Sequence, residues 1–108
     1  MISQRELEKE ILELCSEDDF GSWELWWKIH GDHHRENEEQ LKKWFVNAVA
    51  ALINCGRVIA KRRLPTGDMM STTFEPDKLD RDLAAANDPD PDHNYWFGIG
   101  EKESRLQP

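Results

Sequence analysis

Residues 37–63 read NEEQLKKWFVNAVAALINCGRVIAKRR, and the apolar pattern changes its period within them. Over residues 41–53 the apolar side chains recur every three or four positions, which predicts an α-helix with a wide apolar stripe. Residues 57–64 then alternate with a period of two, which predicts a β-strand. We expect the helix to lie at the centre of the core, because its apolar stripe is the widest in the chain.

Both ends of this central helix carry capping signals. Asn37 is a good N-cap, and Gln40 occupies the reciprocal position of a capping box. Gly56 is suited to the left-handed conformation that often ends a helix. After the strand, residues 65–68 form a Pro- and Gly-containing turn into a second strand candidate, residues 69–75. The sequence therefore predicts a β-hairpin after the central helix.

Two further helices are predicted before the central one. Residues 3–16 have apolar residues on one face, and Ser3 with Glu6 forms a capping box at their start. Residues 22–30 form a shorter, Trp-rich helix that begins at a serine N-cap and ends before Gly31. Both helices offer apolar faces that can pack on the central one.

The C-terminal third of the chain differs in composition from the rest. Pro76 begins a short predicted helix, and residues 87–92 form an acidic linker punctuated by prolines. Residues 95–99 are an aromatic island in a polar tail. This island either folds back as a strand or plug of the core, or docks on another chain. In the second interpretation the contacting residues are Tyr95, Trp96 and Phe97.

The order of these elements over residues 3–75 resembles the winged-helix (winged helix-turn-helix) family, with residues 20–23 as the small first strand. The resemblance implies an α+β fold: a three-helix winged-helix domain with a C-terminal β-hairpin wing, over residues 1–76. Residues 77–108 are expected to add a short helix and the acidic, aromatic tail, packed on the same domain. Winged helices commonly bind DNA through the third helix and the wing, whereas many others bind only protein.

The charge distribution separates one segment from the rest. The chain has a net charge of −8, yet residues 41–67 contain no acidic residue. A basic segment within an acidic chain is a recognised sign of nucleic-acid binding. The candidate double-stranded DNA contacts are Lys42, Lys43, Asn47, Arg57, Lys61, Arg62 and Arg63. Asn47 is the candidate reader of a base edge, and with so few cations a homodimer is expected for specific binding.

Two observations favour other interpretations of the basic segment. Glu36, Glu38 and Glu39 stand at the start of the central helix, where they would repel phosphate. The basic residues could also pair inside the fold with the acidic residues of 3–16 or 77–92.

The competing function is recognition of a basic protein, such as a nucleic-acid-binding protein whose site this chain would occupy. Its acidic surface would be formed by residues 6–19 and 77–92. Trp27 would be an anchor, because it points about 100° away from Trp26 on the same helix. Trp23, Trp26 and Trp44 are expected in the core.

The remaining motifs do not predict catalysis. His30, His33 and His34 fit no short metal-binding motif, and there is no phosphate loop, nucleophile elbow or HExxH sequence. We therefore expect no metal, no cofactor and no enzymatic activity. Cys15 and Cys55 lie in apolar helical patterns and are expected to be reduced packing residues of a cytoplasmic protein. No apolar run approaches the length of about 18 residues that a membrane span needs.

Overall fold

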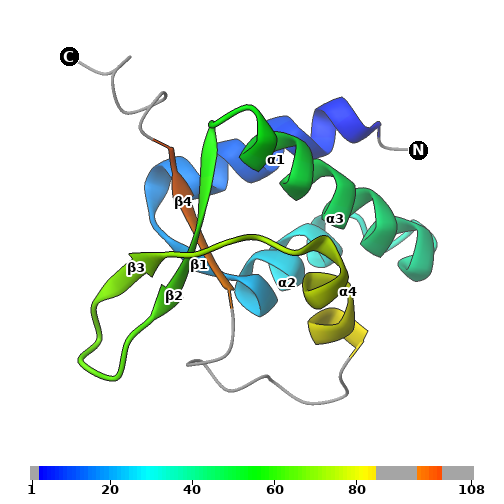
Figure 1. Ribbon diagram of the computed structural model, residues 1–108. Helices are drawn as coiled ribbons and strands as arrows, with labels where there is room; N and C mark the ends of the chain where they lie inside the picture. The colour runs from blue at the N-terminus through cyan, green and yellow to red at the C-terminus, as the bar shows by residue number, and fades with distance from the viewer. Residues whose placement is uncertain (1–2, 85–94, 101–108) are drawn as a thin grey trace.

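An antiparallel β-sheet covers one side of a group of packed helices (Figure 1). The computed structural model describes residues 3–84 and 95–100, and in them it has four helices and four strands. The elements are α1 (Gln4–Glu17), β1 (Phe20–Gly21), α2 (Ser22–Asp32), α3 (Glu38–Asn54), β2 (Val58–Arg63), β3 (Met69–Ser71), α4 (Pro76–Ala84) and β4 (Tyr95–Ile99). None of the helices in these residues is long and apolar enough to cross a membrane.

The strand β4 occupies an inner position in the sheet, whose order is β1-β4-β2-β3. Phe97 lies opposite Phe20 of β1 on one side and Ala60 of β2 on the other. Because side chains alternate along a strand, Tyr95 and Phe97 share one face with Ala60, and this face is buried against the helices. The aromatic island of residues 95–99 thus folds back onto the domain.

The predicted hairpin forms from β2 and β3, but its second strand is shorter than the predicted residues 69–75. The strand ends at Ser71, although the Thr72 amide still donates to the Ala60 carbonyl oxygen of β2 at 3.0 Å, and the residues after Thr72 contact a side chain of β4. The hydroxyl of Tyr95 accepts a hydrogen bond from the Glu75 amide at 2.9 Å and donates one to the Thr73 carbonyl at 3.3 Å. These two hydrogen bonds fix the backbone between the end of β3 and the start of α4.

The predicted caps of α1 and α3 are confirmed. Ser3 Oγ accepts a hydrogen bond from the Glu6 amide, and Asn37 Oδ1 accepts one from the Gln40 amide. Gly56 follows α3 with φ of +78°, a conformation that other residues rarely adopt.

The predicted start of α2 at Ser22 is confirmed, whereas its predicted N-cap is wrong by one residue and its predicted end by two. Gly21 is the N-cap, and the helix continues through Gly31 to Asp32. The last turn holds because the His33 amide donates to the carbonyl oxygen of buried Ile29 at 3.0 Å. Packing of this turn outweighs the preference of glycine for helix ends.

The core lies between the sheet and the helices. Its largest fully buried side chains are Phe45, Phe97, Leu7, Ile11, Leu25, Ile29, Leu41, Leu52, Leu79, Leu83, Val49 and Val58. Trp26 joins this core edge-on to Phe45, with 5.6 Å between the ring centroids. Leu79 and Leu83 come from α4, so α4 is part of the domain core.

The two cysteines differ in environment. Cys15 is buried in α1 as expected, whereas Cys55 is exposed just after α3, so its predicted packing role is wrong. The apolar stripe of α3 has ended by this position, and Cys55 falls at its C-cap. Burial, and after it the negative charge of Asp19, raise the pKa of the Cys15 thiol to about 12, against the opposing effect of Lys61.

Two glycines give a matched test of this packing. A Cβ at Gly100 would overlap the backbone carbonyl of Gly56, whereas a Cβ at Gly31 meets no atom within 4 Å. Gly100→Ala is expected to lower the free energy of unfolding by about 2 kcal/mol, because backbone cannot move aside easily. Gly31→Ala should raise it by about 0.5–1 kcal/mol through helix propensity. Urea unfolding measures both, and equal effects would contradict the structure.

The cysteine environments predict different thiol chemistry. In the native protein at about pH 8, a disulfide reagent should modify Cys55 rapidly and leave Cys15 unmodified. Cys55→Ser should then abolish the fast phase, and a fast phase that survives this change would contradict the assignment.

Alkaline unfolding tests the buried thiol independently. Above pH 9.0 the unfolded state loses the Cys15 proton while the folded state keeps it. The unfolded state is therefore favoured as pH rises, by up to about 1.4 kcal/mol per pH unit. Relative to wild type, Cys15→Ala should lose stability less steeply above pH 9.0. Parallel pH profiles for the two proteins would contradict the raised pKa.

Candidate functional site

The structure distributes the predicted DNA contacts over separate places. Lys42, Lys43 and Asn47 belong to the N-terminal half of α3, and Arg57 lies in the link after this helix. The remaining three, Lys61, Arg62 and Arg63, are on β2. The N-terminal end of α3 and the turn between β2 and β3 lie on opposite sides of the molecule (Figure 1). Residues that form one basic segment in the sequence therefore do not form one continuous surface.

Helix α4 covers part of the α3 face that carries the predicted DNA contacts Lys43 and Asn47. Val46, on that face, is only 7% exposed. A groove of about 300 Å³ separates the two helices, and its lining is Lys43, Val46, Asn47, Pro76, Asp77 and Asp80. The two aspartates of α4 thus lie beside the predicted phosphate and base contacts. Their negative charge opposes the approach of DNA to this face.

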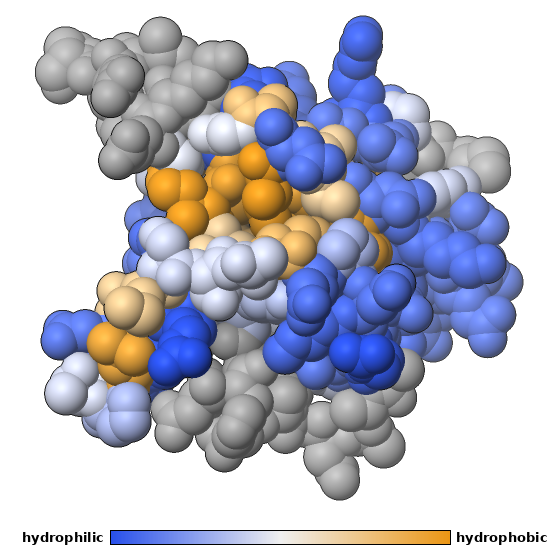
Figure 2. Space-filling model, viewed as in Figure 1, coloured by the Kyte–Doolittle hydropathy of each residue, from blue (hydrophilic) through white to orange (hydrophobic). Residues whose placement is uncertain are grey.

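The surface around α4 is strongly hydrophilic, whereas apolar surface gathers where the C-terminal end of α3 meets the sheet (Figure 2). Ile53, Phe74 and Ile99 are among the partly buried hydrophobic residues that pack against the core.

Three of the predicted cations, Lys42, Arg57 and Lys61, interact with groups of the same chain. Lys61 Nζ lies 3.2 Å from Asp19 Oδ2, and both side chains are partly buried. The Lys42 ammonium lies 6.0 Å from the centroid of the Trp26 ring. The acidic partner of Lys61 lies between α1 and β1, outside the segments considered for internal pairing.

Arg62 and Arg63 remain as an exposed cationic pair near the end of β2. In the hairpin register they lie opposite Met70 and Met69. Neither arginine forms an ion pair with any residue of 3–84 or 95–100. The charges of Arg62 and Arg63 on the hairpin are therefore accessible.

The outer side of α2 carries an exposed aromatic surface. Trp27 is 56% exposed, and its ring lies 6.1 Å from that of Trp23 and 5.9 Å from that of His30. Of the tryptophans expected in the core, Trp26 is buried, whereas Trp23 and Trp44 are partly buried. The indole N–H of Trp23 is buried and has no acceptor among the described residues.

The aromatic residues of β4 offer less surface. Tyr95 is 4% exposed and Phe97 is fully buried, so neither side chain is available to a partner. Trp96 points to the opposite face of the sheet and is partly buried. Of the four predicted partner contacts, Trp27 is the one with a largely exposed side chain.

The histidines in the last turn of α2 and directly after this helix contact different groups. His33 Nε2 lies 2.8 Å from Glu10 Oε2, which links the end of α2 to α1. His30 Nε2 lies 4.0 Å from Glu38 Oε1, and His34 Nδ1 lies 3.2 Å from the Gly31 carbonyl oxygen. In the part of the chain that the structure describes, no three His, Cys, Asp or Glu residues are grouped to hold a metal ion.

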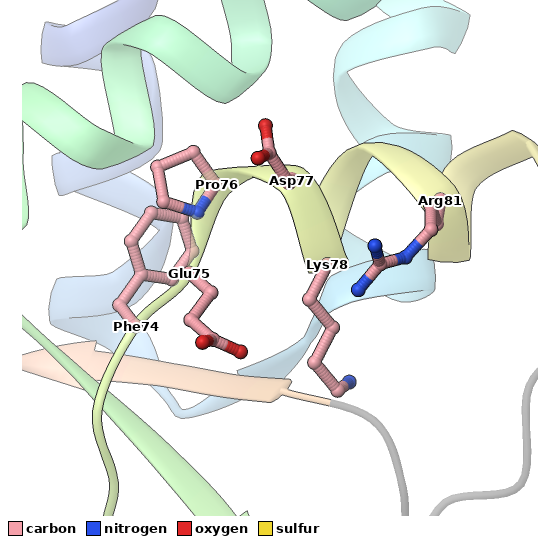
Figure 3. A pocket seen from close by; sticks show the side chains of 6 residues that line it. All are labelled: Phe74, Glu75, Pro76, Asp77, Lys78 and Arg81. Carbon is pink, nitrogen blue, oxygen red and sulfur yellow. The ribbon is translucent and has the colours of Figure 1, made fainter.

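A second pocket of about 340 Å³ lies at the start of α4 (Figure 3). Its lining residues are Phe74, Glu75, Pro76, Asp77, Lys78 and Arg81. Lys78 Nζ lies 2.9 Å from Asp82 Oδ2 and 4.5 Å from the centroid of the Tyr95 ring. The pocket is lined by charged side chains of both signs and by no Ser, Cys or His, so it offers no familiar nucleophile–base pair.

No family model, curated protein or solved structure matches this chain. Function therefore has to be inferred from the side chains and their surroundings. Two accessible surfaces stand out in the described residues: the aromatic surface of α2 around Trp27, and the arginine pair of the hairpin.

Proposed function

We propose that this chain is a non-enzymatic protein-interaction module of winged-helix type whose partner is a basic protein. The architecture is supported by the three helices and short β1 that precede the β2–β3 hairpin, and by the step from α3 through Gly56 into β2. The added strand β4 and helix α4 distinguish this chain from the simple three-helix arrangement.

The observation that carries the proposal is the exposure of Trp27. A tryptophan that leaves more than half of its side chain in water gains little from the core and offers a large, rigid contact area. Tryptophan is enriched among the residues that contribute most to protein interfaces. The neighbouring rings of Trp23 and His30 support its side and limit its freedom before binding.

Charge favours a basic partner. The net charge of −8 attracts cationic proteins and speeds their encounter with this chain. Glu6, Glu13 and Glu17 are exposed on α1, and Asp77 and Asp80 are exposed on α4. These helices therefore supply the acidic surface, while α2 supplies the apolar anchor.

Contact with double-stranded DNA is a second candidate, which the exposed pair Arg62 and Arg63 favours. In this case the hairpin binds phosphates, as the wing does in the family that the chain resembles. The acidic α4 beside Lys43 and Asn47 makes this candidate weaker than the first.

Two variants, each tested with a DNA duplex and with the protein partner, distinguish these two functions. Trp27→Ala removes the aromatic anchor, and Arg62→Glu with Arg63→Glu reverses the charge of the hairpin. We expect a labelled random-sequence duplex to show no binding by fluorescence anisotropy at about 50 mM salt, where electrostatic attraction is strongest. Binding that weakens steeply at about 200 mM and disappears in the arginine variant would overturn the proposal in favour of DNA.

The partner is sought with the immobilised protein in a nuclease-treated extract of the cells that produce it. We expect a basic protein to be retained by wild type and by the arginine variant, and to be lost with Trp27→Ala. Calorimetry with the purified partner should then show at least about a tenfold loss of affinity for Trp27→Ala. Retention that is identical on wild-type and Trp27→Ala resins would contradict the role of the α2 surface.

A further inference from the structure

The ring of Trp27 is left open on the side towards the end of α2. Gly31 follows Trp27 by one helical turn, and a Cβ built at Gly31 meets no atom within 4 Å. Glu24 precedes Trp27 by three residues, which places it on the same side of the helix. Its exposed carboxylate forms no hydrogen bond or ion pair with any residue that the structure describes.

Aromatic rings elsewhere in this molecule already have cations near them. Among the described residues, lysine ammonium groups lie 5.5 Å from the centroid of Phe20, 6.0 Å from that of Trp26 and 4.5 Å from that of Tyr95. The ammonium near Phe20 belongs to Lys28, the residue after Trp27. Trp27 has no such cation from residues 3–84 or 95–100. Among the Phe, Tyr and Trp residues that the structure describes, Trp27 is also the exposed one, at 56%, so its ring is accessible to a cation from outside.

We propose that Trp27 and Glu24 form a docking site for an arginine side chain of the basic partner, a proposal that rests on the function given above. A guanidinium group can stack flat on an indole while its N–H groups bind a carboxylate. Lysine offers a point charge without this planar geometry, so arginine is the better fit. The site thus combines the two contacts that distinguish arginine from other side chains.

The surrounding charge supports a cationic occupant over an apolar one. Residues 22–39 contain five acidic residues and two basic ones. An apolar side chain on Trp27 would cover Glu24 without offering it a donor, which costs free energy. A guanidinium satisfies the carboxylate and the ring together. Glu38, which lies 4.0 Å from His30, adds a further negative charge close to the cluster.

The test uses the whole chain and two six-residue peptides, one of arginine and one of lysine, at about 150 mM salt. Calorimetry is expected to show tighter binding of the arginine peptide, by about fivefold. Trp27→Ala should weaken arginine-peptide binding by about tenfold, and Glu24→Gln by about fivefold. Asp68→Asn removes the same single charge from the hairpin turn and should change the affinity by less than about twofold.

A second variant blocks the site without removing either residue. Gly31→Leu adds a side chain in open space one turn after Trp27, where it can pack on the indole. Thermal unfolding should show that the variant is at least as stable as wild type, because leucine favours helix more than glycine does. Its affinity for the arginine peptide should fall about as much as that of Trp27→Ala.

The outcomes separate this proposal from the proposed function. If Trp27→Ala and Gly31→Leu bind the arginine peptide as wild type does, the arginine site is wrong. The same conclusion follows if Asp68→Asn weakens binding as much as Glu24→Gln, because the attraction then comes from net charge. In both cases a basic partner captured through Trp27 would leave the proposed function standing. If Trp27→Ala retains that partner and neither peptide binds, both proposals fail.

Discussion

The antiparallel pairing of β4 with both β1 and β2 is the constraint on which the rest of the structure depends. The short strand β1 has β4 as its sheet neighbour, and Phe97 lies at the point where the three strands meet. This ring is fully buried and lies 6.0 Å from the rings of Phe74 and Tyr95. Burial of such side chains is the largest favourable contribution to folding.

The inner position of β4 also determines which part of the chain lies beside the α3 face that carries Lys43 and Asn47. After β2 the chain forms β3 at the edge of the sheet and then α4 outside the sheet, before β4 takes its inner place. Leu79 and Leu83 bring α4 onto the core, which places Asp77 and Asp80 beside Lys43 and Asn47. The α3 face that carries the predicted DNA contacts Lys43 and Asn47 is therefore partly covered by an acidic helix of the same chain.

Local signals in the sequence predicted the helices well. Ser3, Asn37 and Gly56 act as expected, because a cap depends on residues within one turn. The direction of Trp27 also follows from the 100° step of an α-helix, since its neighbour Trp26 faces the core. These features need no knowledge of distant contacts.

Features that depend on distant contacts were not predicted from the sequence. Nothing near residues 95–99 specifies an inner strand between β1 and β2. The sequence favoured folding back of this segment but left docking on another chain open. The burial of Val46 by α4, like the ion pair of Lys61 with Asp19, joins segments that are far apart in the chain. Periodicity gives the face of an element, but only packing decides what covers it.

The charge of a segment is a further property that folding redistributes. The basic residues of 41–67 are contiguous in the sequence, yet α3 and β2 carry them to opposite sides of the molecule. On β2 the charge of Lys61 is paired with that of Asp19, whereas Glu24 on α2 stays unpaired among the described residues. Because attraction between charges falls steeply with distance and salt, a ligand responds to the local surface. For this chain the local surface around Trp27 is acidic and aromatic, which favours a cationic partner over a polyanion.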